Sequence, residues 1–224
     1  MSIKRSEIDS VIDQALIYFQ SRKIPLPSFA FWTSQDWLKQ KNTPEEIKKA
    51  HLGWDVTDFG LGNFSSFGRV IFTLRNGFIH NGEFTKPYAQ KIMYMSEGQK
   101  SPIHYHQSKT EDIVNWGEGN IVVRLWPKSK QGTLAKNNVS IFLNWENREI
   151  GAGEKIILKP GDSICIKPHT FHQFWCQENT KHTISMEISS VNNDLNDNFW
   201  LEEIQRYPTI IEDQPKKYLL CYEY

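Results

Sequence analysis

The feature that most constrains the fold is a succession of short β-rich segments after Trp54, with no helical pattern between them. Apolar, β-branched and aromatic residues predict strands, and the Gly, Asn and Asp residues between them predict turns. The expected strands cover residues 70–74, 91–95, 121–126, 139–145, 155–158, 163–166, 173–176 and 183–188. Such an array predicts a mainly β protein built as an antiparallel sandwich or barrel.

Helices are expected only before these strands. Apolar residues within 8–19 recur at helical spacing, which predicts an amphipathic helix. A second helix is expected to begin at Thr43 as its N-cap, with Glu46 completing a capping box and Gly53 as its C-terminal cap. A short helix over 34–39 is expected between the two.

The change of pattern divides the chain into three expected parts. Residues 1–69 form a helical extension packed on the barrel, residues 70–190 form the β-barrel, and residues 191–224 form a C-terminal segment near the barrel mouth. A chain of 224 residues is long enough for one core with such flanks.

Composition limits the partners and the compartment. The 26 Lys and Arg balance the 26 Asp and Glu, so no net field attracts nucleic acid or an anionic membrane, and a small polar partner fits better. Cys165, Cys176 and Cys221 form no CxxC pair, which predicts neither a disulfide framework nor a zinc-thiolate site. Without a signal region or an apolar membrane span, we expect a soluble cytoplasmic protein.

Histidines and a glutamate indicate a metal site. His104 and His106 lie two residues apart on an expected strand, so both imidazoles face one side, and Glu111 can return from the next turn or strand. A His-x-His pair alone is often a surface pair, but a further histidine, His172, follows a turn and a strand. His169 is its rival as fourth ligand. Imidazole and carboxylate together suit manganese, iron, zinc or nickel.

These residues resemble the two motifs of the cupin superfamily. The first is carried by Gly98, His104-x-His106, Glu111 and Gly117, and the second by Gly153, Pro160-Gly161-Asp162, Pro168 and His172. The second motif departs from the family pattern, because Trp175 and Cys176 stand where an asparagine is usual. The resemblance implies a single-domain cupin, an antiparallel β-barrel or jelly roll with N-terminal helices. It favours His172 over His169, because the family's histidine begins the strand after the proline turn.

A narrower resemblance covers most of the chain. Segments 52–60, 72–77, 86–91 and 117–120, with Arg206-Tyr207-Pro208, are similar to the D-lyxose isomerase family. The resemblance implies a manganese-dependent aldose-ketose isomerase that interconverts D-lyxose with D-xylulose, and often D-mannose with D-fructose, as a cytoplasmic homodimer. One divalent ion, Mn²⁺, is expected, although Zn, Fe, Co or Ni could occupy the site in the isolated protein.

The residues also suit this chemistry when they are considered independently. An aldose-ketose interconversion needs an electrophile on two sugar oxygens and a base that reaches the carbon between them. We expect the ion to polarise O1 and O2 and to stabilise the charge of an enediolate. Proton transfer through a cis-enediol is the favoured route, and a metal-assisted hydride shift is the competing one.

Five side chains are candidates for catalysis or substrate binding. Lys91 could enter the barrel as an acid or oxyanion partner, or reach solvent from a strand end. Glu203 is the expected base, although each carboxylate of its segment also fits a surface charge. Lys109, Arg206 and Glu212 are expected substrate contacts.

Other cupin functions stay open at this stage. An oxygenase or decarboxylase would use similar ligands for redox chemistry, and a non-catalytic sugar-binding cupin would hold a purely structural metal. A phosphosugar isomerase is disfavoured, because no compact basic cluster lies beside the motif.

Overall fold

The computed structural model describes residues 2–40, 44–78, 86–180 and 182–224. Its helices are α1 (Arg5–Ser21), the 3-10 helix η1 (Ser28–Phe31), α2 (Ser34–Lys39) and α3 (Glu45–Lys49). Its strands are β1 (Ser2–Lys4), β2 (Gly53–Thr57), β3 (Arg69–Arg75), β4 (Tyr88–Ser96), β5 (His104–His106), β6 (Glu111–Asn115), β7 (Ile121–Pro127), β8 (Val139–Leu143), β9 (Glu146–Ile150), β10 (Lys155–Leu158), β11 (Ser163–Ile166), β12 (Thr170–Cys176), β13 (His182–Ser190), β14 (Asn198–Trp200) and β15 (Thr209–Ile211).

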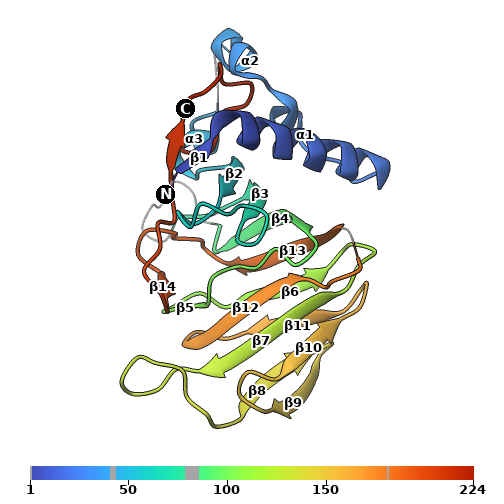
Figure 1. The fold of residues 1–224 in the computed structure, drawn as a ribbon, viewed down its shortest axis with the longest axis vertical. Helices are drawn as coiled ribbons and strands as arrows, with labels where there is room; N and C mark the ends of the chain where they lie inside the picture. Colours follow the sequence, from blue (N-terminus) through green and yellow to red (C-terminus); the bar gives the residue numbers. More distant parts are fainter. Residues whose placement is uncertain (1, 41–43, 79–85, 181) are drawn as a thin grey trace.

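Two antiparallel sheets carry the fold. The larger has the strand order β2-β3-β4-β13-β6-β11-β8-β9, and the smaller has the order β10-β7-β12-β5-β14. The helices gather at one end of the molecule, beside β2 and β3 (Figure 1). The expected mainly β, antiparallel architecture with N-terminal helices is therefore confirmed. Among the described residues, no helix combines the length and apolar character needed to cross a membrane.

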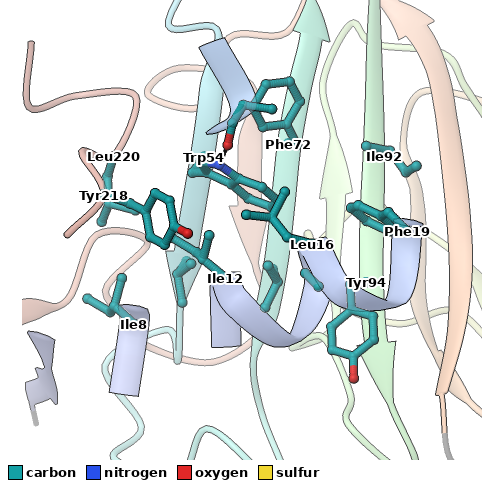
Figure 2. Packing of buried hydrophobic residues seen from close by; sticks show 14 of the residues in the cluster. Ile8, Ile12, Leu16, Phe19, Trp54, Phe72, Ile92, Tyr94, Tyr218 and Leu220 are labelled. Atoms are coloured by element: carbon teal, nitrogen blue, oxygen red, sulfur yellow. Dashed lines mark hydrogen bonds between the residues drawn. The ribbon is translucent and has the colours of Figure 1, made fainter. Parts of the chain in front are cut away.

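Helix α1 is amphipathic, as the sequence predicts, and its apolar face packs on the outer face of the larger sheet. Figure 2 shows the residues that meet there, which are Ile8, Ile12, Leu16, Phe19, Trp54, Phe72, Ile92, Tyr94, Tyr218 and Leu220. The indole nitrogen of Trp54 donates to the carbonyl of Ala30 at 2.8 Å. Each fully buried side chain of this kind stabilises the fold by roughly 1.5–3 kcal/mol, so α1 is an integral part of the core.

The expected end of the second helix is wrong. Helix α3 ends at Lys49, and His51 rather than Gly53 takes the left-handed conformation after it, with a φ of 50°. The main-chain N–H of Leu52 donates to the carbonyl of Ile47, which closes the helix in a Schellman-type arrangement. Gly53 instead begins β2. The expected cap Thr43 lies outside the described residues. The short helix predicted over 34–39 is confirmed.

Each of the eight predicted strand ranges falls on a strand of the structure, in the predicted order, with local differences at the strand ends. The strand expected over 139–145 ends at Leu143, because Asn144 and Trp145 have positive φ and turn the chain into β9. Strand β12 begins at Thr170, earlier than expected, and so includes His172. Strands β1, β2, β6, β9, β14 and β15 were not predicted.

Pairing between distant segments places the C-terminal part of the chain. Strand β14 pairs with β5, so that Trp200 lies opposite His104 and Asn198 lies opposite His106. Strand β15 pairs in parallel with β1, which brings the two termini to one side of the molecule (Figure 1). Strand β2 lies within residues 1–69, which were expected to form a helical extension, but it forms an edge of the larger sheet. The three-part division of the chain otherwise stays a prediction.

Candidate active site

Three histidines converge from two paired strands of the smaller sheet. His104 of β5 lies directly opposite His172 of β12, and His106 is two residues further along β5 on the same face. All three side chains are buried, and their ring nitrogens lie within 4.8 Å of one another. The spacing of two residues on a strand produces this convergence, as the sequence predicts. Such a group could hold a metal ion.

Main-chain carbonyls orient all three imidazoles. The Nδ1 atom of His104 lies 2.9 Å from the carbonyl oxygen of Pro102. The Nδ1 atom of His172 lies 3.0 Å from the carbonyl oxygen of Thr170, and that of His106 lies 3.4 Å from the carbonyl oxygen of Asp197. A carbonyl only accepts, so each Nδ1 donates and each Nε2 is the ring atom available to a metal ion. Metal-binding histidines are oriented in the same way.

The carboxylate of Glu111 meets these nitrogens. Its Oε1 lies 3.0 Å from Nε2 of His172, and its Oε2 lies 3.3 Å from Nε2 of His106. Within the described part of the chain, neither Oε1 of Glu111 nor Nε2 of His172 has a hydrogen-bond partner. Burial lowers the pKa of His104 and of His106, which favours neutral rings. Three imidazoles and a carboxylate facing one another fit a divalent cation.

The rival ligand His169 lies outside this group. It is exposed, has a φ of 61°, and stands in the turn before β12. Its main-chain N–H donates to the carbonyl of His106. The structure therefore uses the backbone of His169, while its ring is not among the three that converge.

A buried chain of charges continues from Glu111. Nζ of Lys109 lies 2.8 Å from Oε2 of Glu111 and 2.9 Å from Oε1 of Glu187. Nζ of Lys91 lies 3.5 Å from the same oxygen of Glu187 and donates to Oδ1 of Asn192 at 2.6 Å. Although burial alone would raise the pKa of Glu187, Lys109 and Lys91 lower it, so the group is a carboxylate at neutral pH.

The sequence-predicted contacts separate into two groups. Lys91, Lys109 and Arg206 line the same cavity as the histidines of β5. Glu203 is exposed and does not line this cavity, so the structure does not bring the expected base to the site. Glu212 does not line the cavity either, and it accepts two hydrogen bonds from the Arg5 guanidinium, at 2.8 and 2.9 Å.

Glu187 is the carboxylate that the sequence reasoning missed. Along β13 the apolar residues Ile184 and Met186 pack under α1, while Ser185 and Glu187 face the barrel interior. A signal was present, because polar residues alternate with apolar ones from 183 to 189. Glu187 also lies opposite Lys91 in the sheet.

An aromatic pair closes one side of the cavity. The ring of Trp200 lies 4.6 Å from that of His104, and the ring of Phe59 lies 5.4 Å from that of Trp200. Phe59 has a φ of 57°, a left-handed conformation that is costly for a residue with a large side chain. Its main-chain N–H donates to the hydroxyl of Thr57 and its carbonyl accepts from Gln205. These bonds hold the ring at the cavity.

Arg206 ties the C-terminal segment to the same place. Its guanidinium forms ion pairs with Asp55 of β2 and with Asp194, the latter at 3.3 Å. Although burial alone would raise the pKa of Asp194, Arg206 lowers it well below its usual value. The pairing joins the edge of the larger sheet to the segment that carries β14.

Comparison with known proteins gives the family. The sequence model of the D-lyxose isomerase family matches residues 3–224. This chain belongs to the D-lyxose isomerase family. Relatives in that family include the D-lyxose/D-mannose isomerases of Escherichia coli O157:H7 and of Serratia proteamaculans. Each is 38% identical over 223 residues, which cover 99% of this chain and 98% of the relative.

Solved structures support the fold. A variant of the L-ribose isomerase of Acinetobacter sp. DL28, in complex with L-ribose, aligns with a TM-score of 0.63 at 15% identity over 94% of this chain and 98% of that one. The ligand-free L-ribose isomerase of Cellulomonas parahominis aligns with a TM-score of 0.61 at 17% identity over 94% and 99%. This chain therefore shares its fold with the L-ribose isomerases along nearly its whole length.

Proposed function

We propose that this member of a sugar isomerase family is a metal-dependent aldose-ketose isomerase for D-lyxose and D-xylulose, and also for D-mannose and D-fructose. The observation that carries the proposal is the buried Glu187 carboxylate, joined through Lys109 to Glu111 beside three converging imidazoles. The names of the two relatives at 38% identity support the choice of sugars.

Four side chains would hold the ion, namely His104, His106, Glu111 and His172. A bound divalent cation would polarise the two sugar oxygens next to the reacting carbons. The donor atoms are imidazole nitrogens and carboxylate oxygen. Such a set suits manganese, the expected ion, and also iron, cobalt, nickel or zinc. Burial of the four side chains excludes water from their side of the cavity.

Glu187 is the proposed base. Its carboxylate would take the proton from C2 of the aldose and return it to C1, while the hydroxyl proton of O2 passes to O1, so that the carbonyl moves by one carbon and no external oxidant is consumed. Lys109 keeps Glu187 ionised and in place, because its Nζ bridges that carboxylate and Glu111. Lys91, on the other side of Glu187, is the proposed donor to a sugar oxygen.

The experiment is an anaerobic incubation of the manganese-loaded chain with a panel of aldopentoses and aldohexoses in heavy water. We expect ketose from D-lyxose and D-mannose, with solvent deuterium at the carbon that receives the proton. A ketose product without deuterium would support a hydride shift instead of the Glu187 route. A protein that binds metal and yields no ketose from any sugar would exclude the isomerase function.

Anaerobic conditions also separate the competing cupin chemistry, since an oxygenase would stop without oxygen. The homodimer and the cytoplasmic location that the family resemblance implies stay predictions.

A further inference from the structure

Arg69 is a buried arginine on the wall of the active-site cavity. It lies on β3, is only 2% exposed, and lines the same cavity as His104 and Glu111. Its neighbour on the same face of the strand, Ile71, lines the cavity too. No role in the proposed reaction uses this side chain, so its placement needs a separate explanation.

The hydrogen bonds of Arg69 leave part of the guanidinium unused. Nη1 donates to the carbonyls of Gly68 at 2.8 Å and Gln99 at 3.0 Å, and Nη2 donates to that of Phe174 at 2.6 Å. A guanidinium has five N–H donors, so the N–H of Nε and the second N–H of Nη2 have no acceptor among the described residues. The ring of Phe174, 4.6 Å from the guanidinium carbon, fixes the plane of the group.

The charge of Arg69 is also uncompensated. The other cations of the cavity, Lys91, Lys109 and Arg206, all form ion pairs with buried carboxylates, which are Glu187 for the two lysines and Asp55 for Arg206. Among the described residues, Arg69 forms none. Burial lowers its pKa to about 9, so the side chain is still a cation at neutral pH. A buried cation without a counter-charge is costly, and a ligand that offers oxygen acceptors would reduce this cost.

The sheet register places Arg69 away from the proposed proton-transfer groups. Thr73 lies opposite Lys91, whereas Arg69 precedes Thr73 by four residues, about 13 Å along the strand at roughly 3.3 Å per residue. The apolar pair Ile71 and Met93 lies between them. The cavity thus has a reactive end, an apolar middle and a second polar end at Arg69.

We propose that Arg69 binds the hydroxyl groups at the end of the sugar remote from the carbonyl. The inference rests on the proposed function and deepens it, because it assigns the orientation of the sugar in the cavity. The sugar's O4 or O5 would accept from Nε and Nη2, the two donors that the main chain leaves unused. With three of its donors already engaged, a single guanidinium suits a neutral hydroxyl better than a phosphate, which is usually held by several cations or main-chain N–H groups.

The test compares the manganese-loaded wild type with Arg69→Gln and Arg69→Lys on D-lyxose, 4-deoxy-D-lyxose and 5-deoxy-D-lyxose. The kcat/KM of each variant is divided by the kcat/KM of the wild type on the same sugar. Differences in ring form between the sugars then cancel. Arg69→Lys keeps the charge and covers the case in which Arg69→Gln does not fold. Metal content is measured for every protein.

Arg124→Gln is the matched control. Arg124 also donates to a main-chain carbonyl, that of Gly153 at 2.8 Å, and its guanidinium carbon lies 4.9 Å from the ring centre of Trp126, but it does not line the cavity. Its loss should change kcat/KM on all three sugars by less than about twofold, since surface substitutions of this kind have small effects.

On D-lyxose, Arg69→Gln should lower kcat/KM by roughly ten- to a hundredfold, mostly through KM, as expected for a lost charged hydrogen bond to substrate. On the deoxy sugar that lacks the contacted hydroxyl, the kcat/KM of the variant and that of the wild type should differ by less than about threefold. An equal loss on all three sugars would make Arg69 a structural residue. The wild type is also assayed on D-lyxose 5-phosphate, and a preference for that sugar would show that Arg69 binds a phosphate instead of a hydroxyl group. A wild type that converts no sugar would instead remove the proposed function.

Discussion

Nε2 of His172 and Oε1 of Glu111 lie 3.0 Å apart, and neither atom has a hydrogen-bond partner within the described residues. Nδ1 of His172 faces the carbonyl of Thr170, so Nε2 is the ring atom that faces the carboxylate oxygen. A divalent cation bound by both atoms would satisfy them together. The relationship is therefore the strongest local indication of a metal centre in the molecule.

Removal of one imidazole should remove the ion. We expect the His104→Ala and His172→Ala variants to lose most of the bound metal during dialysis. The loss of one ligand of four leaves the cation poorly coordinated. Metal content per chain, measured by mass spectrometry, checks the expectation. His169→Ala is the control and should retain the metal, since that ring is exposed. Retention by His172→Ala, or loss by His169→Ala, would contradict the ligand assignment.

Replacement of the proposed base should affect turnover rather than binding. Glu187→Gln keeps the shape of the side chain, and we expect kcat to fall by about 10²–10⁴-fold with little change in KM. Steady-state kinetics on D-lyxose measure both constants. The control is Glu203→Gln, which alters an exposed carboxylate and should retain near wild-type kcat. If Glu203→Gln lost activity and Glu187→Gln kept it, the base originally expected from the sequence would be correct.

Acid should weaken the attachment of the C-terminal segment. Although burial alone would raise the pKa of Asp194, Arg206 lowers it below the usual 3.8. A carboxylate with a lowered folded-state pKa contributes stability above its unfolded pKa and loses that contribution as the pH falls through the folded value. Below about pH 4, Asp194 should therefore add up to about 1.4 kcal/mol per pH unit to the loss of unfolding free energy.

Urea unfolding at a series of pH values checks this slope. Asp194→Asn should be less stable than wild type at neutral pH and should show a shallower decline below about pH 4, because it has no proton to take up. Equal slopes for the two proteins would show that the ion pair of Asp194 and Arg206 does not contribute to acid sensitivity.

Because the backbone of Phe59 is left-handed, replacement by glycine should destabilise the protein less than replacement by alanine, which is the reverse of the usual order. We expect Phe59→Gly to be more stable than Phe59→Ala by about 1 kcal/mol, since only glycine adopts a positive φ without strain. Both should raise KM, because they remove the ring that contacts Trp200. At Phe72, a buried residue in the extended strand β3, alanine should instead be the more stable replacement. The same order at both positions would mean that the Phe59 backbone is unstrained.

The residues that converge on the candidate metal centre were predictable because their positions follow from local rules. Two residues apart on a strand share a face, so His104 and His106 could be paired from sequence alone. The choice of His172 over His169 rested instead on the resemblance to the second cupin motif, in which the histidine begins the strand after the proline turn. The expected strands depended in the same way on local composition, which determines where a strand forms but not which strands pair.

Glu187 and Glu203 show where local rules stop. An isolated strand of alternating polarity is expected to turn its apolar side to the barrel interior, yet β13 turns Glu187 inward, because α1 covers Ile184 and Met186 from outside. That arrangement depends on packing between segments far apart in the chain. Glu203 follows the pair Phe199-Trp200, of which Trp200 lines the cavity, but its own side chain is exposed. The parallel pairing of β1 with β15 is equally non-local.

The most direct test of the central claim is D-xylulose formation from D-lyxose as the ion content of the full chain is varied. Chelation should abolish product while the far-ultraviolet circular dichroism of the fold persists, and readdition of Mn²⁺ should restore activity in proportion to the ion bound, saturating at one per chain. Undiminished D-xylulose formation by the metal-free chain, or none by the chain with its ion bound, would contradict a metal-dependent isomerase.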